Sequence, residues 1–270
     1  MKIGSVVAAT KAALTAIRGM TPAPGLPLNV TSSPPPGERI LILAPHADDE
    51  TLGCGGSIKK YIDDGKHVEV VILTDGRLGD PDIRATRSSR SRAEREHALI
   101  ALRQQETRNA MDTLGVNAVT FLAAADGRLA SANGMFIESL LRRFAAVRPD
   151  IVFVPFFLDR HPDHQAATTC LYAVYQRWGR AQDVTLAAYE IWSPLAANTL
   201  VDISSVADFK WQAIAAYQSQ LKDVDYLSAT KGLNRFRAIA GLLPGSAYAE
   251  AFFVCPLPTY LELYRQYKSG

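Results

Sequence analysis

The chain has 270 residues, of which 48% are hydrophobic and 21% are charged, and its formal net charge at pH 7 is +2. This length suits one large domain with a sizeable core, and the composition is ordinary for a soluble globular enzyme. The small net charge argues against capture of nucleic acid, and no stretch reaches the ~20 apolar residues of a membrane span. We therefore predict no nucleic-acid partner and no membrane-spanning segment.

The first part of the chain differs in composition from the rest. Residues 1–20 have the pattern of a short amphipathic helix, whose apolar run is interrupted by Lys11 and is too short for a typical signal peptide. Residues 21–38 contain six prolines and are predicted to be an extended linker. We therefore divide the chain into an N-terminal extension at 1–37 and one domain at 38–270. Docking of the helix onto the domain or onto a second subunit is favoured, which leaves a homo-oligomer open.

The first predicted strand is residues 40–44, five apolar residues in a row that are typical of a strand buried on both faces. A turn with His46, Asp48, Asp49 and Glu50 follows, and it leads into a helix predicted at 51–64. One imidazole and three carboxylates are an unusual density of metal-binding groups for a plain connection. In a parallel sheet such a turn faces the ligand crevice, so a site is predicted there.

Strands and helices then alternate along the chain. Further strands are predicted at 68–73, 119–122, 151–157 and 186–192, and further helices at 92–114, 135–146, 165–178, 206–220 and 260–267. The buried face of the helix at 92–114 is expected to include Leu102, and that of the helix at 206–220 to include Phe209 and Tyr217. Alternation of this kind predicts an α/β fold, with a Rossmann-like, mostly parallel sheet sandwiched by helices in a single domain.

A second group of donor side chains follows the predicted strand at 151–157. Asp159, His161, Asp163 and His164 occupy the turn before the next helix, so its layout repeats that of the first turn. If the two strands are neighbours in the sheet, the two turns meet and can share a divalent metal ion. Spacing alone does not choose between Asp48 and Asp49 as a ligand.

The three cysteines, Cys54, Cys170 and Cys255, are too few and too scattered for a disulfide framework, and none forms a CxxC pair. A reducing compartment fits this usage, so a cytoplasmic location is predicted.

The two turns carry a family resemblance. Residues 45–56, Pro-His-Ala-Asp-Asp-Glu-Thr-Leu-Gly-Cys-Gly-Gly, together with residues 161–164, His-Pro-Asp-His, resemble the motifs of the LmbE / PIG-L family of zinc-dependent N-deacetylases. The resemblance runs from about residue 39 to about residue 254. Two positions depart from the family pattern: Ala47 stands where proline is usual, and Arg77 stands where an acidic residue is frequent. The second departure is expected to affect what the rim of the pocket accepts.

The resemblance implies a role for each residue of the two turns. It implies that His46, Asp49 and His164 bind Zn²⁺, that Asp48 is the general base, and that a protonated His161 stabilises the oxyanion. Asp163 is expected to hold the His161 ring, with a helix N-cap as the alternative. Protonation of the departing amine by Asp48 or by His161 is left open.

Substrate contacts are also expected outside the turns. Arg103 resembles a family position that meets sugar or phosphate oxygens, although an ion pair with Glu106 one helical turn away is the alternative. Asp126 follows another predicted strand and is expected to accept from sugar hydroxyls. Tyr189 and Trp192 are candidates for a wall beside a sugar ring, with burial in the core as the alternative.

The resemblance implies a zinc-dependent hydrolase that removes the N-acetyl group from an N-acetylglucosamine-type amino sugar or its conjugate, as a small molecule or a glycan. One alternative is an amidase of a thiol-sugar conjugate or of another amide on the same fold. A metal-binding protein without catalysis is another. The last is a nucleotide-binding Rossmann module, suggested by Gly53, Gly55 and Gly56, although their spacing departs from GxGxxG and carboxylates crowd the place of a phosphate.

Overall fold

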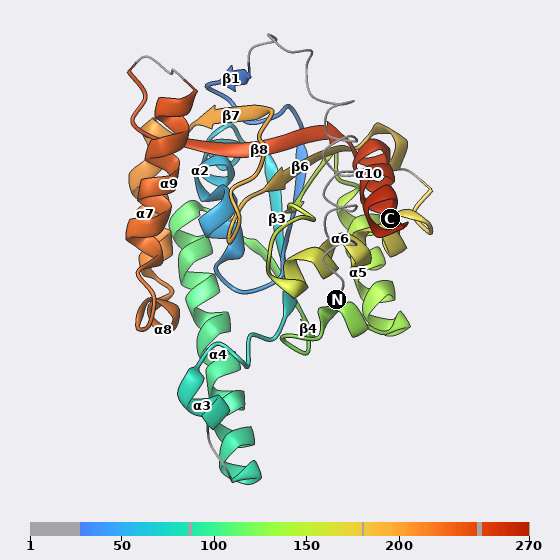
Figure 1. The fold of residues 1–270 in the computed structure, drawn as a ribbon, viewed down its shortest axis with the longest axis vertical. Helices are drawn as coiled ribbons and strands as arrows, with labels where there is room; N and C mark the ends of the chain where they lie inside the picture. The colour runs from blue at the N-terminus through green and yellow to red at the C-terminus, as the bar shows by residue number, and fades with distance from the viewer. Residues whose placement is uncertain (1–27, 86–87, 180, 242–244, 270) are drawn as a thin grey trace, which may run out of the picture.

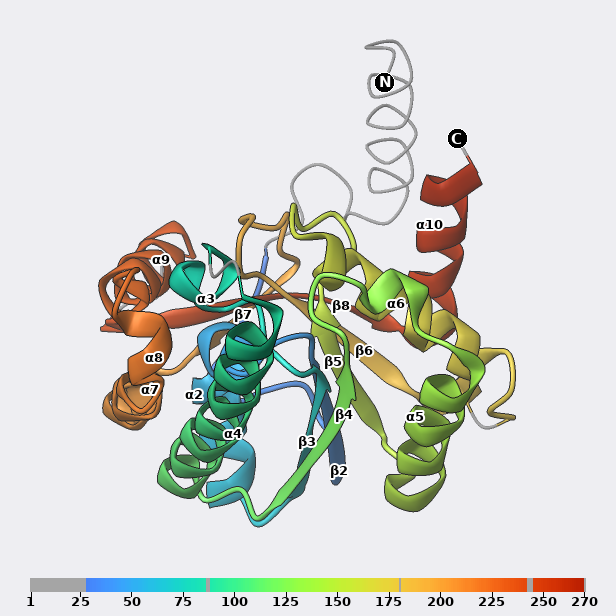
Figure 2. The same ribbon diagram turned by 90° about the horizontal axis from the view of Figure 1, so that it is seen from below.

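The computed structural model describes residues 28–85, 88–179, 181–241 and 245–269. The helix predicted at 1–20 and the first part of the proline-rich linker lie outside these residues. The described part forms one eight-stranded sheet with helices on both faces (Figures 1 and 2). The predicted single-domain α/β fold is therefore confirmed.

The sheet has the strand order β1-β7-β8-β6-β5-β2-β3-β4. The strands are β1 (Asn29–Thr31), β2 (Arg39–Ala44), β3 (His67–Thr74), β4 (Ala118–Ala124), β5 (Ile151–Pro155), β6 (Thr185–Tyr189), β7 (Thr199–Asp202) and β8 (Ala249–Pro256). Strands β4, β3, β2, β5 and β6 run parallel to one another, and β8 is antiparallel to both β6 and β7. The sheet is therefore mostly parallel, and the proline-rich linker contributes β1 as an edge strand parallel to β7.

Helices cover the sheet in two layers. They are α2 (Asp49–Asp63), α3 (Pro81–Ala85), α4 (Ser89–Leu114), α5 (Gly134–Val147), α6 (Pro162–Tyr175), α7 (Ala207–Ala215), α8 (Gln218–Leu221), α9 (Tyr226–Ala240) and α10 (Leu257–Ser269), with short 3₁₀ turns at Leu129–Ser131, Ala181–Asp183 and Ser204–Val206. Figure 2 shows α2, α4, α7 and α9 on one side of the sheet and α5, α6 and α10 on the other. None of the described helices has both the length and the apolar character that crossing a membrane requires.

The central strands owe their position to their apolar runs. Residues 40–44 of β2 are fully buried, as expected for a strand that has helices on both faces and a parallel neighbour on each side. Strands β3 and β5 flank β2 directly. Because β2 and β5 are parallel neighbours, the turns that follow them lie at the same edge of the sheet.

Two details of the predicted helices are wrong. The helix predicted at 206–220 is divided into α7 and α8, and the break falls at Tyr217. Phe209 and Leu102 were expected on buried faces, but both are exposed, whereas Tyr217 is buried as expected. The other predicted strands and helices are present, with ends within a few residues of the predicted ones.

A buried ion pair joins α2 to the sheet. The Glu250 carboxylate of β8 accepts hydrogen bonds from the backbone N–H groups of Gly56 and Ser57 at 2.8 Å each, and its Oε1 lies 2.7 Å from Nζ of Lys210 on α7. Glu250 and Lys210 have no exposed surface. This carboxylate fixes the helix that carries Asp49 and Glu50 in its first turn.

Replacement of Glu250 by alanine is expected to destabilise the fold by ~3–5 kcal/mol, because Lys210 would be left buried without its partner. The matched control is Asp63→Ala, which removes the exposed partner of Lys59 and is expected to cost less than ~1 kcal/mol. Urea unfolding of both variants measures the difference. Equal losses of stability would contradict the role assigned to the buried pair.

Candidate active site

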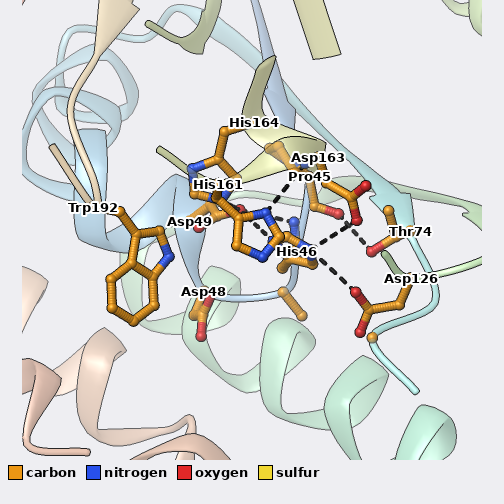
Figure 3. Close-up of polar contacts among 12 residues, drawn as sticks. Pro45, His46, Asp48, Asp49, Thr74, Asp126, His161, Asp163, His164 and Trp192 are labelled. Carbon is orange, nitrogen blue, oxygen red and sulfur yellow. Dashed lines mark hydrogen bonds and ion pairs between the residues drawn. The ribbon is translucent and has the colours of Figure 1, made fainter. Parts of the chain in front are cut away.

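Three histidines from the two turns meet at the carboxyl edge of the sheet. His46 follows β2, while His161 and His164 lie at the start of α6, after β5. The ring centres are 4.7 Å apart for His46 and His161, 5.4 Å for His46 and His164, and 4.7 Å for His161 and His164 (Figure 3). The structure thus brings together two loops that are more than a hundred residues apart in sequence.

Asp49 lies between two of these rings. Its Oδ2 is 3.2 Å from Nδ1 of His46 and 3.2 Å from Nε2 of His164, and all three side chains are buried. Neither ring nitrogen of His164 has a hydrogen-bond partner of acceptable geometry, which is unusual for a fully buried imidazole. Ligand atoms that share a tetrahedral ion at ~2.0–2.2 Å lie roughly 3.3–3.6 Å apart. The two distances from Asp49 to the imidazoles lie close to this spacing, so His46, Asp49 and His164 are candidate ligands of a divalent cation.

Other donor groups surround the His46 ring. Ligand atoms of His46, His161 and His164 lie within 4.8 Å of one another, and so do those of His46, Asp126 and Asp163. The two carboxylates of the second group are already engaged by backbone donors. Asp163 accepts from the N–H groups of Gly127 and Leu129, and Asp126 accepts from the N–H group of Leu78. Asp49 is engaged in the same way, since its Oδ2 accepts from the backbone N–H of His46 at 2.8 Å. The feature that favours the grouping of His46, Asp49 and His164 is therefore the buried His164 ring, whose two nitrogens have no hydrogen-bond partner.

Asp126 and Asp163 orient His46. One oxygen of each lies 3.3 Å from Nε2 of His46, which directs the opposite nitrogen of the ring toward Asp49. Carboxylates commonly hold metal-binding histidines in this way. The Asp163 carboxylate does not hold the His161 ring, because it contacts His46 and the loop at 127–129; Asp163 contacts that ring through its backbone N–H instead.

The residue that caps α6 is His161, not Asp163. Nδ1 of His161 accepts from the backbone N–H of Asp163 at 3.2 Å, so this nitrogen carries no proton. Burial lowers the pKa of His161, and the neighbouring His46 and His164 lower it further. Both observations favour a neutral ring with its proton on Nε2, and the role of His161 in catalysis stays a prediction.

Asp48 has an unusual backbone conformation that directs it away from the candidate metal ligands. Its φ of 128° and ψ of −30° are strained values for a residue other than glycine, and such strain is often found at functional sites. Burial raises the pKa of the Asp48 carboxyl to about 8, although the Arg103 guanidinium, 3.6 Å away, lowers it. The structure thus distinguishes the two adjacent aspartates: Asp49 lies between the imidazoles, and Asp48 lies beside Arg103.

Glu50 holds the strained backbone in place. Its Oε2 accepts from the backbone N–H of Asp48 at 3.2 Å, and its Oε1 accepts from the hydroxyls of Thr51 and Tyr217. Sequence reasoning assigned no role to Glu50. The signal that could have found it is its position as a third acidic residue in a buried turn, where only a partnered carboxylate is tolerated.

Asp159 is a second residue to which no role was assigned. Its Oδ1 accepts from the backbone N–H of His161 at 2.9 Å and lies 3.2 Å from Nδ1 of His164, while its Oδ2 accepts from the N–H of Trp192 at 2.9 Å. Burial raises the pKa of Asp159, but the contact with His164 outweighs it and the net shift is downward. Asp159 therefore positions His164 from the side opposite to Asp49.

Arg103 and Asp126 line the cavity, but their polar atoms contact the protein. Nη2 of Arg103 donates to the carbonyl of Ala47 at 2.7 Å, and Nη1 donates to that of Gly76 at 3.2 Å. Glu106 accepts two hydrogen bonds from Ser219 instead of pairing with Arg103. The guanidinium thus braces two loops beside Asp48, and contact of Arg103 or Asp126 with a substrate stays a prediction.

The cavity above the cluster has a volume of about 420 Å³, within the ~300–1,000 Å³ usual for small-molecule sites. Trp192 lines it and is partly exposed, as expected for a wall residue. Tyr189 is fully buried and its hydroxyl donates to the carbonyl of Leu43 at 2.8 Å. The core alternative is therefore correct for Tyr189.

The glycines that follow the first turn serve packing. Gly53, Gly55 and Gly56 lie within α2, not in a loop. A Cβ at Gly53 would lie 2.1 Å from Cδ2 of Tyr189, and one at Gly56 would lie 2.6 Å from Cγ2 of Ile203. Their absence of side chains lets α2 lie close to the sheet, and the nucleotide-binding alternative loses the feature that suggested it.

Binding of a divalent cation such as Zn²⁺ to the metal-free protein is expected to release protons. Burial lowers the pKa of His46, but contacts with Asp126, Asp163 and Asp49 outweigh it and raise the pKa well above its usual value. Burial likewise lowers the pKa of His164, but Asp49 raises it to about 9. Below these values both rings are protonated, so the cation must displace protons and its apparent affinity rises with pH up to about 9.

Calorimetric titration in two buffers of different ionisation enthalpy measures the number of protons released. We expect protons to be released at pH 7, and we expect their number to fall toward zero above the pKa of His164. Identical proton counts at both ends of this range would contradict the protonation assigned to the cluster. The matched control is His97→Ala, an exposed position on α4, which should not change the count.

The fold and the site define an α/β protein with a candidate divalent-metal centre at the carboxyl edge of its parallel strands. Residues 41–175, half of the chain, match the model of the PIG-L family, described as GlcNAc-PI de-N-acetylase. The chain therefore belongs to the PIG-L family of deacetylases, and the family predicted from the two motifs is confirmed.

Individual relatives agree with this assignment. Diacetylchitobiose deacetylase of Thermococcus kodakarensis is 26% identical over 233 residues, which cover 81% of this chain and 84% of the relative. The solved structure of the conserved protein TT1542 from Thermus thermophilus has a TM-score of 0.65 and 29% identity, and the match covers 82% of this chain and 95% of that one. GalB, the 4-carboxy-2-hydroxymuconate hydratase from Pseudomonas putida, has a TM-score of 0.66 at 22% identity, over 80% of this chain and 95% of that one. The last likeness concerns the fold alone.

Proposed function

We propose that the protein is a zinc-dependent hydrolase that removes the acetyl group from an N-acetylglucosamine-type amino sugar or its conjugate. One observation supports the proposal most: the Asp49 carboxylate lies 3.2 Å from both the His46 and the His164 ring, and the adjacent Asp48 has a strained backbone and a raised pKa. The diacetylchitobiose deacetylase relative supports the substrate class.

The proposed ligands of the zinc ion are His46, Asp49 and His164. When bound there, zinc supplies positive charge that polarises an amide carbonyl and lowers the pKa of water. Asp126, Asp163 and Asp159 hold the two imidazoles by contacts of 3.2–3.3 Å. These carboxylates keep both rings directed at a single position.

Asp48 is proposed to take the proton from the attacking water and to give it to the departing amine. A carboxyl group whose pKa lies near neutrality suits both transfers, and burial brings the pKa of Asp48 to about 8. The neutral His161 donates from Nε2 to the oxygen of the amide carbonyl as negative charge develops there. This role needs a donor in a fixed orientation, which the hydrogen bond to Nδ1 provides.

The test is a free-amine and acetate assay of the zinc-loaded protein against N-acetylglucosamine, diacetylchitobiose, a thiol-sugar conjugate and simple acetamides. One acetate for each amine, from sugar substrates, is the expected result. Release of a larger acyl group would favour the amidase alternative. Zinc binding without release from any amide would overturn the proposal and leave a metal-binding protein that does not hydrolyse amides.

We also propose a cytoplasmic location, a division of the chain into an extension and one domain, and a homo-oligomer. The three cysteines are unpaired, which supports a reducing compartment such as the cytoplasm. The division into an extension at 1–37 and a domain at 38–270 would be tested by limited proteolysis. Homo-oligomer formation would be tested by sedimentation of the full chain.

A further inference from the structure

The entrance of the cavity differs in character from its floor. The candidate catalytic cluster forms the floor, whereas apolar and aromatic side chains line the rest of the cavity, and we call them the apolar mouth: Leu78, Pro81, Ile191, Trp192, Val224 and Tyr226. They come from the segment between β3 and the start of α3, the loop after β6 and the segment from α8 to the start of α9, and the last of these segments also contributes the polar Gln220 and Asp223. Three segments that are distant in sequence therefore each contribute apolar surface.

Several of these side chains are exposed although they are large and apolar. Leu78 is 37% exposed, Trp192 41% and Val224 42%. Apolar groups gathered at the entrance of a concave site are more informative than single exposed ones, because such a patch gains free energy when a ligand covers it. The exposed apolar surface of the mouth is therefore typical of a site that binds an apolar group.

The aromatic wall of the mouth is tied to the catalytic cluster. The Trp192 ring meets the Tyr226 ring edge to face, with centres 5.8 Å apart. The backbone N–H of Trp192 donates to Asp159, whose other oxygen lies 3.2 Å from His164 (Figure 3 shows the indole beside His161 and Asp48). A ligand whose amide lies at the cluster would therefore extend along a wall in a fixed position.

The charges of the cavity oppose an anionic ligand. Its lining includes the carboxyl groups of Asp48, Asp49, Asp126 and Asp223, and the cationic groups among the described lining residues are Arg103 and, in the absence of a metal ion, His46, whose pKa is raised. The Arg103 guanidinium donates to two backbone carbonyls and faces Asp48, and its Nε is buried without a partner. The His46 ring contacts Asp49, Asp126 and Asp163, so both cationic groups face the protein. Arg160 lies 6.0 Å from the centre of the Trp192 ring but does not line the cavity. A phosphate or carboxylate in the mouth would lose its hydration without an available partner.

We propose that the apolar mouth is a subsite for an uncharged, apolar group, alkyl or aryl, attached to the amino sugar. This inference rests on the proposed function, since the acetamide at the floor sets the direction in which the rest of the substrate leaves the cavity. Trp192 and Tyr226 flank the attached group, and Leu78 and Val224 cover it from the other loops.

The experiment compares methyl and hexyl glycosides of N-acetylglucosamine, of the same anomeric configuration, with N-acetylglucosamine 1-phosphate. For the zinc-loaded full chain, kcat/KM for the hexyl glycoside is expected to exceed that for the methyl glycoside at least ~10-fold, mainly through KM, about the effect of burying two methylene groups. The 1-phosphate is expected to fall below the methyl glycoside. Calorimetric dissociation constants for the same three ligands give a readout that needs no turnover.

Variants test the residues. Trp192→Ala and Val224→Asn are expected to reduce the hexyl-to-methyl ratio toward one, and Val224→Arg is expected to raise the relative affinity for the 1-phosphate. The matched control is Phe236→Asn, on α9, where the side chain is 59% exposed and does not line the cavity. This control is expected to keep the wild-type ratio.

The outcomes separate the two proposals. Equal kcat/KM and equal affinity for the methyl and hexyl glycosides would overturn the subsite and leave the deacetylase proposal standing. Preferential binding of the hexyl glycoside without release of amine from any sugar would support the subsite and overturn the deacetylase. Preference for the 1-phosphate over the methyl glycoside would overturn the charge argument, and no binding of any of the three ligands would overturn the subsite.

Discussion

Replacement of Asp48 by asparagine is expected to lower kcat for amide hydrolysis by ~10²–10⁴-fold while zinc content stays at that of the wild type. Asparagine has the shape of aspartate but cannot take up the proton of the attacking water. The proposed zinc ligands are His46, Asp49 and His164, so the substitution leaves all three in place. Free-amine release and metal analysis of the same preparation measure both quantities.

The backbone at position 48 makes asparagine a suitable replacement. Asparagine tolerates positive φ better than most residues, so the φ of 128° should not by itself prevent folding. The matched control is Asp208→Asn, an exposed position on α7, which is expected to keep wild-type turnover. Unchanged kcat in Asp48→Asn with zinc retained would exclude Asp48 as the base. Loss of zinc would show instead that Asp48 is a ligand.

The pH dependence of the wild type follows from the same carboxyl group. As a base Asp48 must be ionised, so activity rises with pH through its pKa. That pKa is about 8 in the absence of a cation and falls when positive charge is bound nearby. The acid limb of the profile of kcat/KM is therefore expected below pH 8. Persistence of the same limb in the residual activity of Asp48→Asn would assign it to another group.

The position of the site could be predicted because it follows from the sheet. The apolar runs of β2 and β5 require strands buried on both faces, and a parallel arrangement of neighbours places the turns after them at one edge. His46 and His164 lie in those turns, so their convergence needs no knowledge of side-chain contacts. Periodicity and burial predict the two turns, whereas the pairing of β2 with β5 was a condition of the prediction that the structure meets.

The roles within the site could not be predicted in the same way, because they depend on loops that arrive from elsewhere in the chain. The Asp163 carboxylate contacts His46 and not His161, because the loop at 127–129 presents two N–H groups to it. The Nδ1 atom of His161 caps α6, which favours the neutral form of the ring. Local sequence gives no information on either neighbour.

The C-terminal third was predicted least well. Strands β7 and β8 and helix α9 were not predicted, and α9 carries exposed Phe236 and Ile239, which obscure the helical pattern. The break between α7 and α8 falls at Tyr217, whose hydroxyl donates to Glu50 near the catalytic cluster.

Replacement of His164 by alanine is expected to weaken zinc binding at least ~100-fold, because it removes one of three protein ligands, whereas loss of a residue that merely orients a ligand costs ~10–100-fold. Competition with a chelator measures the dissociation constant. Zinc is also expected to raise the melting temperature of the wild type and not that of the variant. The matched control is His97→Ala, an exposed histidine on α4, which should bind zinc as the wild type does.

A companion variant separates the two donor groups that share His46. Asp159→Asn keeps all three proposed ligands and loses one contact to His164, so a ~10–100-fold effect is expected, smaller than that of His164→Ala. If His164→Ala bound zinc as tightly as the wild type, the ion would have to lie on the opposite side of the His46 ring, with Asp126 and Asp163. Asp126→Ala would then be the variant that loses zinc.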